Sequence, residues 1–187
     1  MRPVVIWLRR VATTASWETI EDDEGRIVLV MDPASSFGTG SHATTRLCME
    51  QLDGLDCADK HILDMGCGKG RVSFFLAQTI GCRTTGVDFD SNMIEIAENN
   101  RKNVQHQELI QFVCAKAEEY EITDEDCFYF FNPFSEKILR SVMGHILDSW
   151  YQCPRSIKLF FYYPSDEYVA YLMTNPFLMP FNEPYED

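Results

Sequence analysis

From residue 61 onwards, two patterns of apolar residues alternate along the chain. Short runs that are apolar on both faces predict buried strands over 61–66, 83–89, 110–115, 127–133 and 157–163. Between them, apolar residues at helical spacing predict helices over 71–80, 91–103, 135–150 and 166–173, the second with Ser91 as its N-cap. Strands that alternate with helices are typical of a parallel sheet covered on both faces. We therefore predict an α/β fold with a doubly wound, mostly parallel sheet.

The first 33 residues follow a different pattern, with two short apolar runs on either side of a polar stretch. These runs predict strands over 4–8 and 26–31, separated by the turn signal EDDEG. A loop, ASSFGTGS, follows Asp32-Pro33 and leads into a helix over 44–52. We predict an amino-terminal appendage of strands or a hairpin over residues 1–33, and one main domain over residues 34–187.

Composition and charge narrow the class of protein. Hydrophobic residues make up 45% of the chain, enough to bury a core, which excludes a disordered protein. The 16 basic and 29 acidic residues give a formal net charge of −13, which disfavours nucleic acid and anionic membranes as partners. No stretch approaches the ~20 apolar residues of a membrane span, and the run at 4–8 is too short for the core of a secretion signal. Seven cysteines without CxxC spacing predict reduced thiols, no metal site and a cytoplasmic protein.

A glycine-rich loop, DMGCGKG at 64–70, lies between the first strand and the first helix of the main domain. Gly66, Gly68 and Gly70 carry no Cβ, so the backbone can approach a ligand closely. The helix that follows offers unpaired backbone N–H groups at its amino end. A loop of this composition at this position predicts a cofactor site.

Two acidic residues and one arginine indicate which cofactor the loop binds. Asp88 ends the second strand 22 residues after Gly66, a spacing that suits a carboxylate on the hydroxyls of a ribose. A dinucleotide fingerprint requires a third glycine where this chain has Arg71. Asp64, before the glycines, suits an ammonium group better than a pyrophosphate. S-adenosylmethionine carries an ammonium, a sulfonium and no phosphate, so these residues favour it over NAD.

The chain resembles the class I S-adenosylmethionine-dependent methyltransferases, most closely the bacterial ribosomal-protein methyltransferases that modify lysine side chains and an amino-terminal amine. The string FGTGSHATT at 37–45 carries the resemblance, which continues to the GVDFD at 86–90. It implies a Rossmann-like fold, S-adenosyl-L-methionine as cofactor, and Thr45 beside the methionine part. The predicted cofactor-binding residues are Phe37, Gly38, Thr39, Gly40, Thr45, Asp64, Gly66, Gly68, Gly70, Asp88, Phe89, Ala117, Glu118 and Asn132.

The chain departs from that family at three places, one of which is the end of the fourth strand, where the family has Asn followed by aliphatic residues and this chain has Asn132-Pro133-Phe134. The family carries a separate amino-terminal domain that presents the ribosomal substrate, whereas about thirty residues precede Asp32-Pro33 here. We therefore expect the methyl acceptor to be a protein or a small molecule, without naming it. Many class I enzymes have an aspartate near the adenine where this chain has Lys116, so we expect the Ala117 backbone or Glu118 to take that role.

Asn132-Pro133-Phe134 ends the fourth strand at the edge of the sheet where ligands bind in open α/β folds. It resembles a shortened form of the (Asn/Asp)-Pro-Pro-aromatic motif of amino-group methyltransferases. The Asn132 side-chain carbonyl and the Pro133 backbone carbonyl can accept the hydrogens of a nitrogen nucleophile and aim its lone pair. The Phe134 ring can stack on the target or pack in the core, and both alternatives remain open. We predict these three residues as catalytic.

Three functions from different classes fit the sequence. The leading one is a methyltransferase that acts on a nitrogen of a protein or small molecule. The second is a non-catalytic protein that keeps the cofactor pocket and serves as a scaffold. The third, an NAD(P)-linked oxidoreductase, is disfavoured by Arg71. Three prolines in the tail after residue 173 argue against closing strands. The edge of the sheet is then reduced, covered by a partner chain or covered by the amino-terminal strands, and an exposed edge favours a homodimer.

Overall fold

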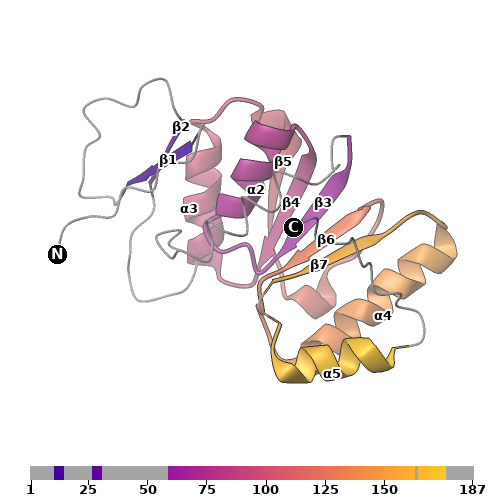
Figure 1. Cartoon of the computed structure of the whole chain (residues 1–187). Helices are drawn as coiled ribbons and strands as arrows, with labels where there is room; N and C mark the ends of the chain where they lie inside the picture. The colour runs from indigo at the N-terminus through magenta and orange to yellow at the C-terminus, as the bar shows by residue number, and fades with distance from the viewer. Residues whose placement is uncertain (1–10, 15–26, 31–58, 163, 176–187) are drawn as a thin grey trace, which may run out of the picture.

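The computed structural model describes residues 11–14, 27–30, 59–162 and 164–175 (Figure 1). The predicted loop at 34–41 and the predicted helix at 44–52 lie outside these residues, as does the predicted strand at 4–8. No helix of the described part has both the length and the apolar character that crossing a bilayer requires.

A five-stranded sheet forms the centre of the molecule. Its strands are β3 (His61–Met65), β4 (Arg83–Asp88), β5 (Ile110–Cys114), β6 (Cys127–Phe130) and β7 (Lys158–Phe161). They lie in the order β5-β4-β3-β6-β7, and every neighbouring pair is parallel. The chain builds outward from β3 to one side and then returns to build on its other side, so the predicted doubly wound parallel sheet is confirmed.

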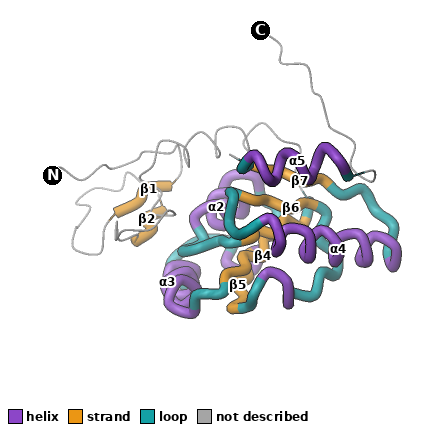
Figure 2. Tube along the Cα trace, turned by 90° about the horizontal axis from the view of Figure 1, so that it is seen from below, coloured by secondary structure: helices purple, strands orange, loops and turns teal. Residues whose placement is uncertain are grey.

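Helices cover both faces of this sheet (Figures 1 and 2). On one face lie α2 (Arg71–Phe75), which continues as the π-helical turn η1 (Leu76–Ile80), and α3 (Ser91–Arg101). On the other face lie α4 (Glu136–Gln152) and α5 (Asp166–Thr174). The single turns η2 (Gln107–Leu109) and η3 (Ala117–Glu119) flank β5.

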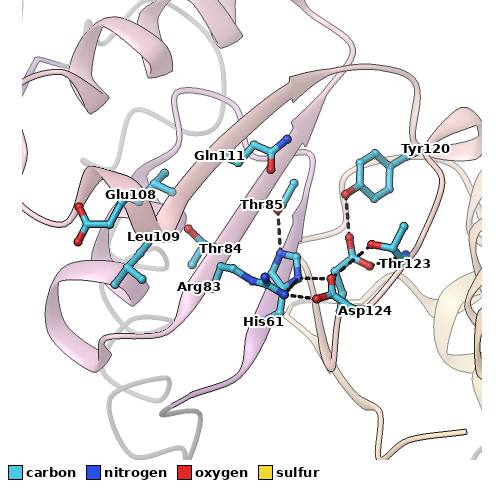
Figure 3. A pocket seen from close by; sticks show the side chains of 12 residues that line it. His61, Arg83, Thr84, Thr85, Glu108, Leu109, Gln111, Tyr120, Thr123 and Asp124 are labelled. Carbon is cyan, nitrogen blue, oxygen red and sulfur yellow. Dashed lines mark hydrogen bonds and ion pairs between the residues drawn. The ribbon is translucent and has the colours of Figure 1, made fainter. Parts of the chain in front are cut away.

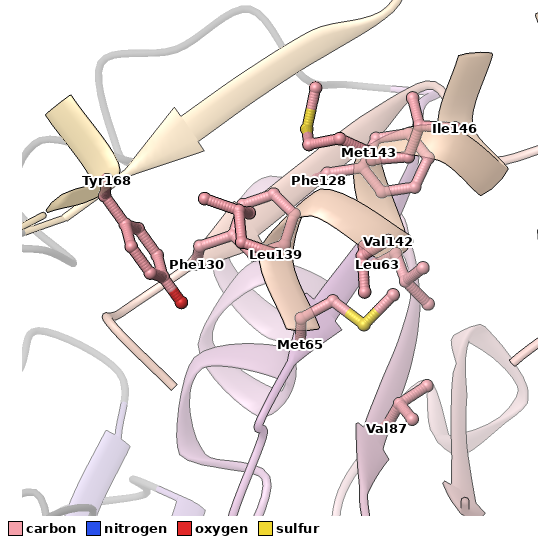
Figure 4. Packing of buried hydrophobic residues seen from close by; sticks show 10 residues of the cluster. All are labelled: Leu63, Met65, Val87, Phe128, Phe130, Leu139, Val142, Met143, Ile146 and Tyr168. Carbon is pink, nitrogen blue, oxygen red and sulfur yellow. The ribbon is translucent and has the colours of Figure 1, made fainter. Parts of the chain in front are cut away.

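The largest cluster of buried side chains in the described core lies under α4 and α5, where ten of them meet (Figure 4). Helix α4 contributes residues three and four positions apart, which places them on one stripe facing the sheet. The cluster consists of Leu63, Met65, Val87, Phe128, Phe130, Leu139, Val142, Met143, Ile146 and Tyr168. Burying each such side chain stabilises the fold by about 1.5–3 kcal/mol. This packing holds the carboxyl ends of β3 and β6 in place.

A separate two-stranded sheet lies in the amino-terminal part. Strand β2 (Ile27–Val30) falls within the strand predicted over 26–31, whereas β1 (Val11–Thr14) was not predicted. The two strands pair in parallel, whereas the strand at 4–8 that the predicted hairpin requires lies outside the described residues. Residues 15–26 separate them, which is long enough for the crossover that parallel pairing needs. The extent of the appendage, residues 1–33, stays a prediction.

The N-cap of α3 is also corrected. Ser91 is the first helical residue, and Asp90 is the N-cap because its carboxylate accepts a hydrogen bond from the backbone N–H of Asn92 at 2.9 Å. A carboxylate accepts a hydrogen bond from this amide as well as a serine hydroxyl does. Its negative charge is also stabilised by the positive end of the helix dipole.

Candidate functional site

The predicted motifs come together at one edge of the sheet, where the parallel strands end. Gly66 follows β3, Asp88 ends β4, and Asn132 lies just after β6. Strand β3 pairs with both β4 and β6, so the three positions lie on neighbouring strands. This is the edge at which open α/β sheets bind their ligands.

The glycine loop is hydrogen-bonded to the end of β4, and the described residues leave space beside Gly68 in the middle of the loop. The backbone N–H groups of Gly66 and Cys67 donate to the carbonyl of Val87 at 2.8 and 3.1 Å. Gly68 has a φ of +55°, and a Cβ built on it would meet none of the described residues within 4 Å. Gly70, by contrast, faces the Phe112 ring, which lies 2.3 Å from where a Cβ would be. The loop therefore packs tightly at its end and forms an open cradle at Gly68.

The carboxylate of Asp88 is held by two backbone amides. One oxygen accepts from Gly68 N at 2.9 Å and the other from Asp90 N at 2.9 Å. Each carboxylate oxygen has a second lone pair, so both remain able to accept a hydroxyl of a ligand. The next residue, Phe89, is 78% exposed, which leaves its ring available to a planar group. The geometry fits the predicted ribose contact.

Asp64 lies beneath the loop and is nearly inaccessible, with an exposed fraction of 3%. Its carboxylate accepts a hydrogen bond from the Ser73 hydroxyl at 2.8 Å. Burial raises the pKa of Asp64 to about 6, partly offset by hydrogen bonds from Ser73, and the nearby Asp88 charge raises it further. Asp64 therefore changes charge just below neutral pH.

The Asn132-Pro133 turn touches the glycine loop. Asn132 is exposed and has a φ of +44°, a left-handed conformation that asparagine tolerates better than most residues. A Cβ built on Gly66 would lie 2.5 Å from the Cβ of Pro133, so only glycine fits at position 66. The predicted cofactor loop and the predicted catalytic turn are thus in direct contact.

Phe134 is half-buried and packs against the core. Its ring lies edge-on to Phe130 with centroids 6.2 Å apart and is tilted against the ring of Tyr168 at 6.5 Å. The Tyr168 hydroxyl donates to the backbone carbonyl of Phe134 at 2.7 Å. The sequence contained no signal for Tyr168, which lies 34 residues further along the chain. The packing role of Phe134 is observed, and its contact with a substrate stays a prediction.

The remaining predicted residues lie at the exit of β5 or outside the described part. Ala117 and Glu118 are half-buried in η3, whereas Lys116 is exposed and pairs with Glu119 at 2.7 Å. Their predicted contact with adenine stays a prediction. Phe37, Gly38, Thr39, Gly40 and Thr45 lie outside the described residues.

A polar cluster that the sequence did not predict lies at the opposite, amino-terminal edge of the strands (Figure 3). It lines a cavity of about 280 Å³, where His61 contacts Asp124 at 2.9 Å and Arg83 pairs with the same carboxylate. Buried Glu125 accepts from the Tyr120 hydroxyl at 2.7 Å. His61, Asp124 and Glu125 each offer a potential metal ligand within 4.8 Å of the others. Arg83 already forms an ion pair with Asp124, and the Tyr120 hydroxyl already donates a hydrogen bond to Glu125. We therefore interpret the cluster as a structural hydrogen-bond network.

Comparison with known proteins points to one family. A family model described as ribosomal protein L11 methyltransferase matches residues 2–128. The ribosomal protein L11 methyltransferase of Trichlorobacter lovleyi is 42% identical over 98 residues, 49% of this chain and 32% of the relative. That of Deinococcus radiodurans is 40% identical over 94 residues, 50% of this chain and 34% of the relative. The chain thus spans about a third of the length of these curated relatives.

A solved structure supports the fold. The ribosomal protein L11 methylase of Lactobacillus delbrueckii subsp. bulgaricus superimposes with a TM-score of 0.55 at 18% identity, covering 78% of this chain and 71% of that one. The Rossmann-like fold implied by the family resemblance is therefore confirmed. Because the family model matches residues 2–128 of 187, the chain belongs to the ribosomal protein L11 methyltransferase family.

Proposed function

We propose that this protein is a methyltransferase that uses S-adenosyl-L-methionine to methylate a nitrogen of a protein or small molecule. The observation that carries the proposal is the contact between Gly66 and Pro133, because it joins a cofactor cradle to a turn suited to holding an amine. The curated relatives are named as methyltransferases of a ribosomal protein, which supports a protein acceptor. The family offers no support for the dinucleotide oxidoreductase that the glycine loop also allowed.

The residues at the rim fit this cofactor. The open cradle at Gly68 leaves room for a ligand beside the backbone, and Asp88 has one free lone pair on each oxygen for the two ribose hydroxyls. Two carboxylates, Asp64 and Asp88, suit a ligand that carries positive charge and no phosphate. When bound, the cofactor supplies a methyl group activated by a sulfonium.

The chain's own contribution to the reaction is orientation. The Asn132 side-chain carbonyl and the Pro133 backbone carbonyl would accept hydrogens of the acceptor nitrogen, which aims its lone pair toward the cradle. The left-handed turn at Asn132 and the close packing of Pro133 on Gly66 hold these oxygens in place. Positioning of this kind is a recognised source of rate enhancement.

Methyl transfer from radiolabelled S-adenosylmethionine to fractionated ribosomal proteins and to small amines tests the proposal. We expect calorimetry to show cofactor binding and label to appear in an acceptor fraction. Binding without transfer to any fraction would favour the scaffold alternative, in which the fold keeps the pocket without catalysis. Failure to bind the cofactor at all would reject both.

The raised pKa of Asp64 predicts a pH dependence of cofactor binding. If the ionised carboxylate attracts the cofactor's ammonium, the dissociation constant should rise as pH falls through about 6, the pKa of Asp64 in the folded protein. At pH 5 we expect binding about tenfold weaker than at pH 8. Asp64→Asn should bind weakly at both values and show a flatter profile by calorimetry.

Protein stability should respond to pH in the opposite direction. The folded pKa of Asp64 lies above its value of 3.8 in an unfolded chain, so its contribution to stability is present at acidic pH and is lost as pH rises through about 6. The difference in melting temperature between the unliganded protein and Asp64→Asn should therefore change between pH 5 and pH 7. Parallel profiles in the two proteins would contradict the raised pKa.

Location and assembly remain proposals. Cys67, Cys114 and Cys153 form no disulfide among the described residues, which supports a reducing, cytoplasmic environment. Strand β7 pairs only with β6 among the described strands, and three of its four residues are half-buried. An edge of this kind supports a homodimer. Light scattering that shows only monomer at high concentration would remove that proposal.

A further inference from the structure

Arg71 is a buried cation without a partner. Its exposed fraction is 3%, and none of its three guanidinium nitrogens has a hydrogen-bond partner among the residues that the structure describes. The two buried carboxylates described above each have a hydrogen-bond partner. Asp64 accepts from the Ser73 hydroxyl, and Glu125 accepts from the Tyr120 hydroxyl. Burial lowers the pKa of Arg71 to about 10, so it stays charged at neutral pH. An unpaired buried charge is costly, and a native structure that keeps one needs an explanation such as a bound ion or ligand.

The position of Arg71 in the chain places it beside the glycine loop. It is the first residue of α2 and directly follows Gly70. Side chains in a helix tilt toward its amino end, so the Arg71 side chain extends back toward the loop. Ser73 faces the sheet, because it bonds to Asp64 on β3, and Arg71 lies about 200° away around the helix. Arg71 therefore lies on a different face of α2 from Ser73 and close to the glycine loop.

Resting on the proposed function, we propose that Arg71 binds the carboxylate of the amino acid end of S-adenosylmethionine. That end of the cofactor is a zwitterion, with an ammonium that Asp64 attracts and a carboxylate that requires a cation. Arg71 is suited to this role because its guanidinium can form a bidentate pair with a carboxylate. A phosphate ligand fits less well, because Asp64 and Asp88 would both repel it. The bound carboxylate supplies the partner that Arg71 lacks.

Calorimetry with two related ligands tests this assignment without measuring activity. Decarboxylated S-adenosylmethionine keeps the nucleoside, the sulfonium and the ammonium and lacks only the carboxylate. We expect the wild-type protein to prefer S-adenosylmethionine by about 30-fold, and Arg71→Met to lose that preference while binding the decarboxylated compound as before. Arg101→Met is the matched control, because Arg101 lies on α3 and pairs with Glu98. It should keep the full preference.

The stability of the variants separates a binding role from a structural one. Replacing an unpaired buried guanidinium with methionine should leave the melting temperature of the unliganded protein unchanged or raise it. If Arg71→Met does not fold, Arg71→Gln serves for the same titrations. An unchanged preference in the variant, or an equal loss of affinity for both ligands, would overturn the proposal while leaving the proposed function standing. A wild-type protein that binds neither ligand would overturn both.

Discussion

Asp88→Ala should weaken the binding of S-adenosylmethionine by at least ~100-fold and leave the protein folded. The carboxylate has two functions that alanine cannot replace. It accepts hydrogen bonds from Gly68 N and Asp90 N, which hold the cradle in shape, and its free lone pairs face the position proposed for the ribose hydroxyls. Hydrogen bonds to a charged group contribute about 1.5–3 kcal/mol each, so losing two accounts for an effect of this size.

Two further variants separate the effect of losing the Asp88 carboxylate from the effect of losing one negative charge anywhere on the protein. Glu95→Gln removes one negative charge from the exposed face of α3 and should bind the cofactor as the wild type does. Asp88→Asn keeps the shape of the side chain and should lie between the two in affinity. Calorimetry gives the affinities, and the melting temperature checks the fold. Wild-type affinity in Asp88→Ala would exclude this carboxylate from the site.

Asn132→Gly should lower turnover by about 100-fold. Asn132 has a φ of +44°, a conformation that glycine adopts without steric cost. The substitution therefore keeps the turn, the Pro133 carbonyl and the contact with Gly66 while removing only the side-chain amide. Loss of a group that aligns the acceptor nitrogen lowers turnover, whereas a change in cofactor affinity would report the contact with the cofactor that the sequence also predicts for Asn132.

A comparison with Asn132→Ala measures the contribution of the left-handed backbone conformation at position 132. Alanine removes the same amide but adds a cost of about 1–2 kcal/mol for the left-handed conformation, so its melting temperature should fall below that of Asn132→Gly. Steady-state kinetics on an identified acceptor measure the effect on turnover. If Asn132→Gly turns over as fast as the wild type, Asn132 serves the shape of the turn and does not orient the substrate.

Most elements of the main sheet could be predicted because their signals are local. The buried strand at His61–Met65 and the helix that follows Gly70 lie within one residue of their predicted bounds. Their apolar spacing and the glycines with positive φ between them reflect constraints on neighbouring residues. The N-cap of α3 was misplaced by one position, because Asp90 and Ser91 are both good caps and only the backbone conformation distinguishes them.

Contacts between distant segments could not be predicted from these patterns. The sequence assigned no chemistry to His61, yet the fold brings it to Asp124, 63 residues away. Tyr168 reached the carbonyl of Phe134 only because α5 packs beside the end of β6. The parallel pairing of β1 with β2 was missed because the strand β1 itself was not predicted.

By itself, the sequence determined the order of the elements, the glycine loop and the acidic residues that suit a positively charged cofactor. Each of these depends on residue type and on spacing along the chain. The tertiary structure decided that Gly66 touches Pro133, that Asp64 is buried deeply enough to change its pKa, and that Arg71 is buried without a hydrogen-bond partner among the described residues. These properties depend on how strands align and how helices pack across the sheet, and that arrangement is set by the whole set of side chains in the core.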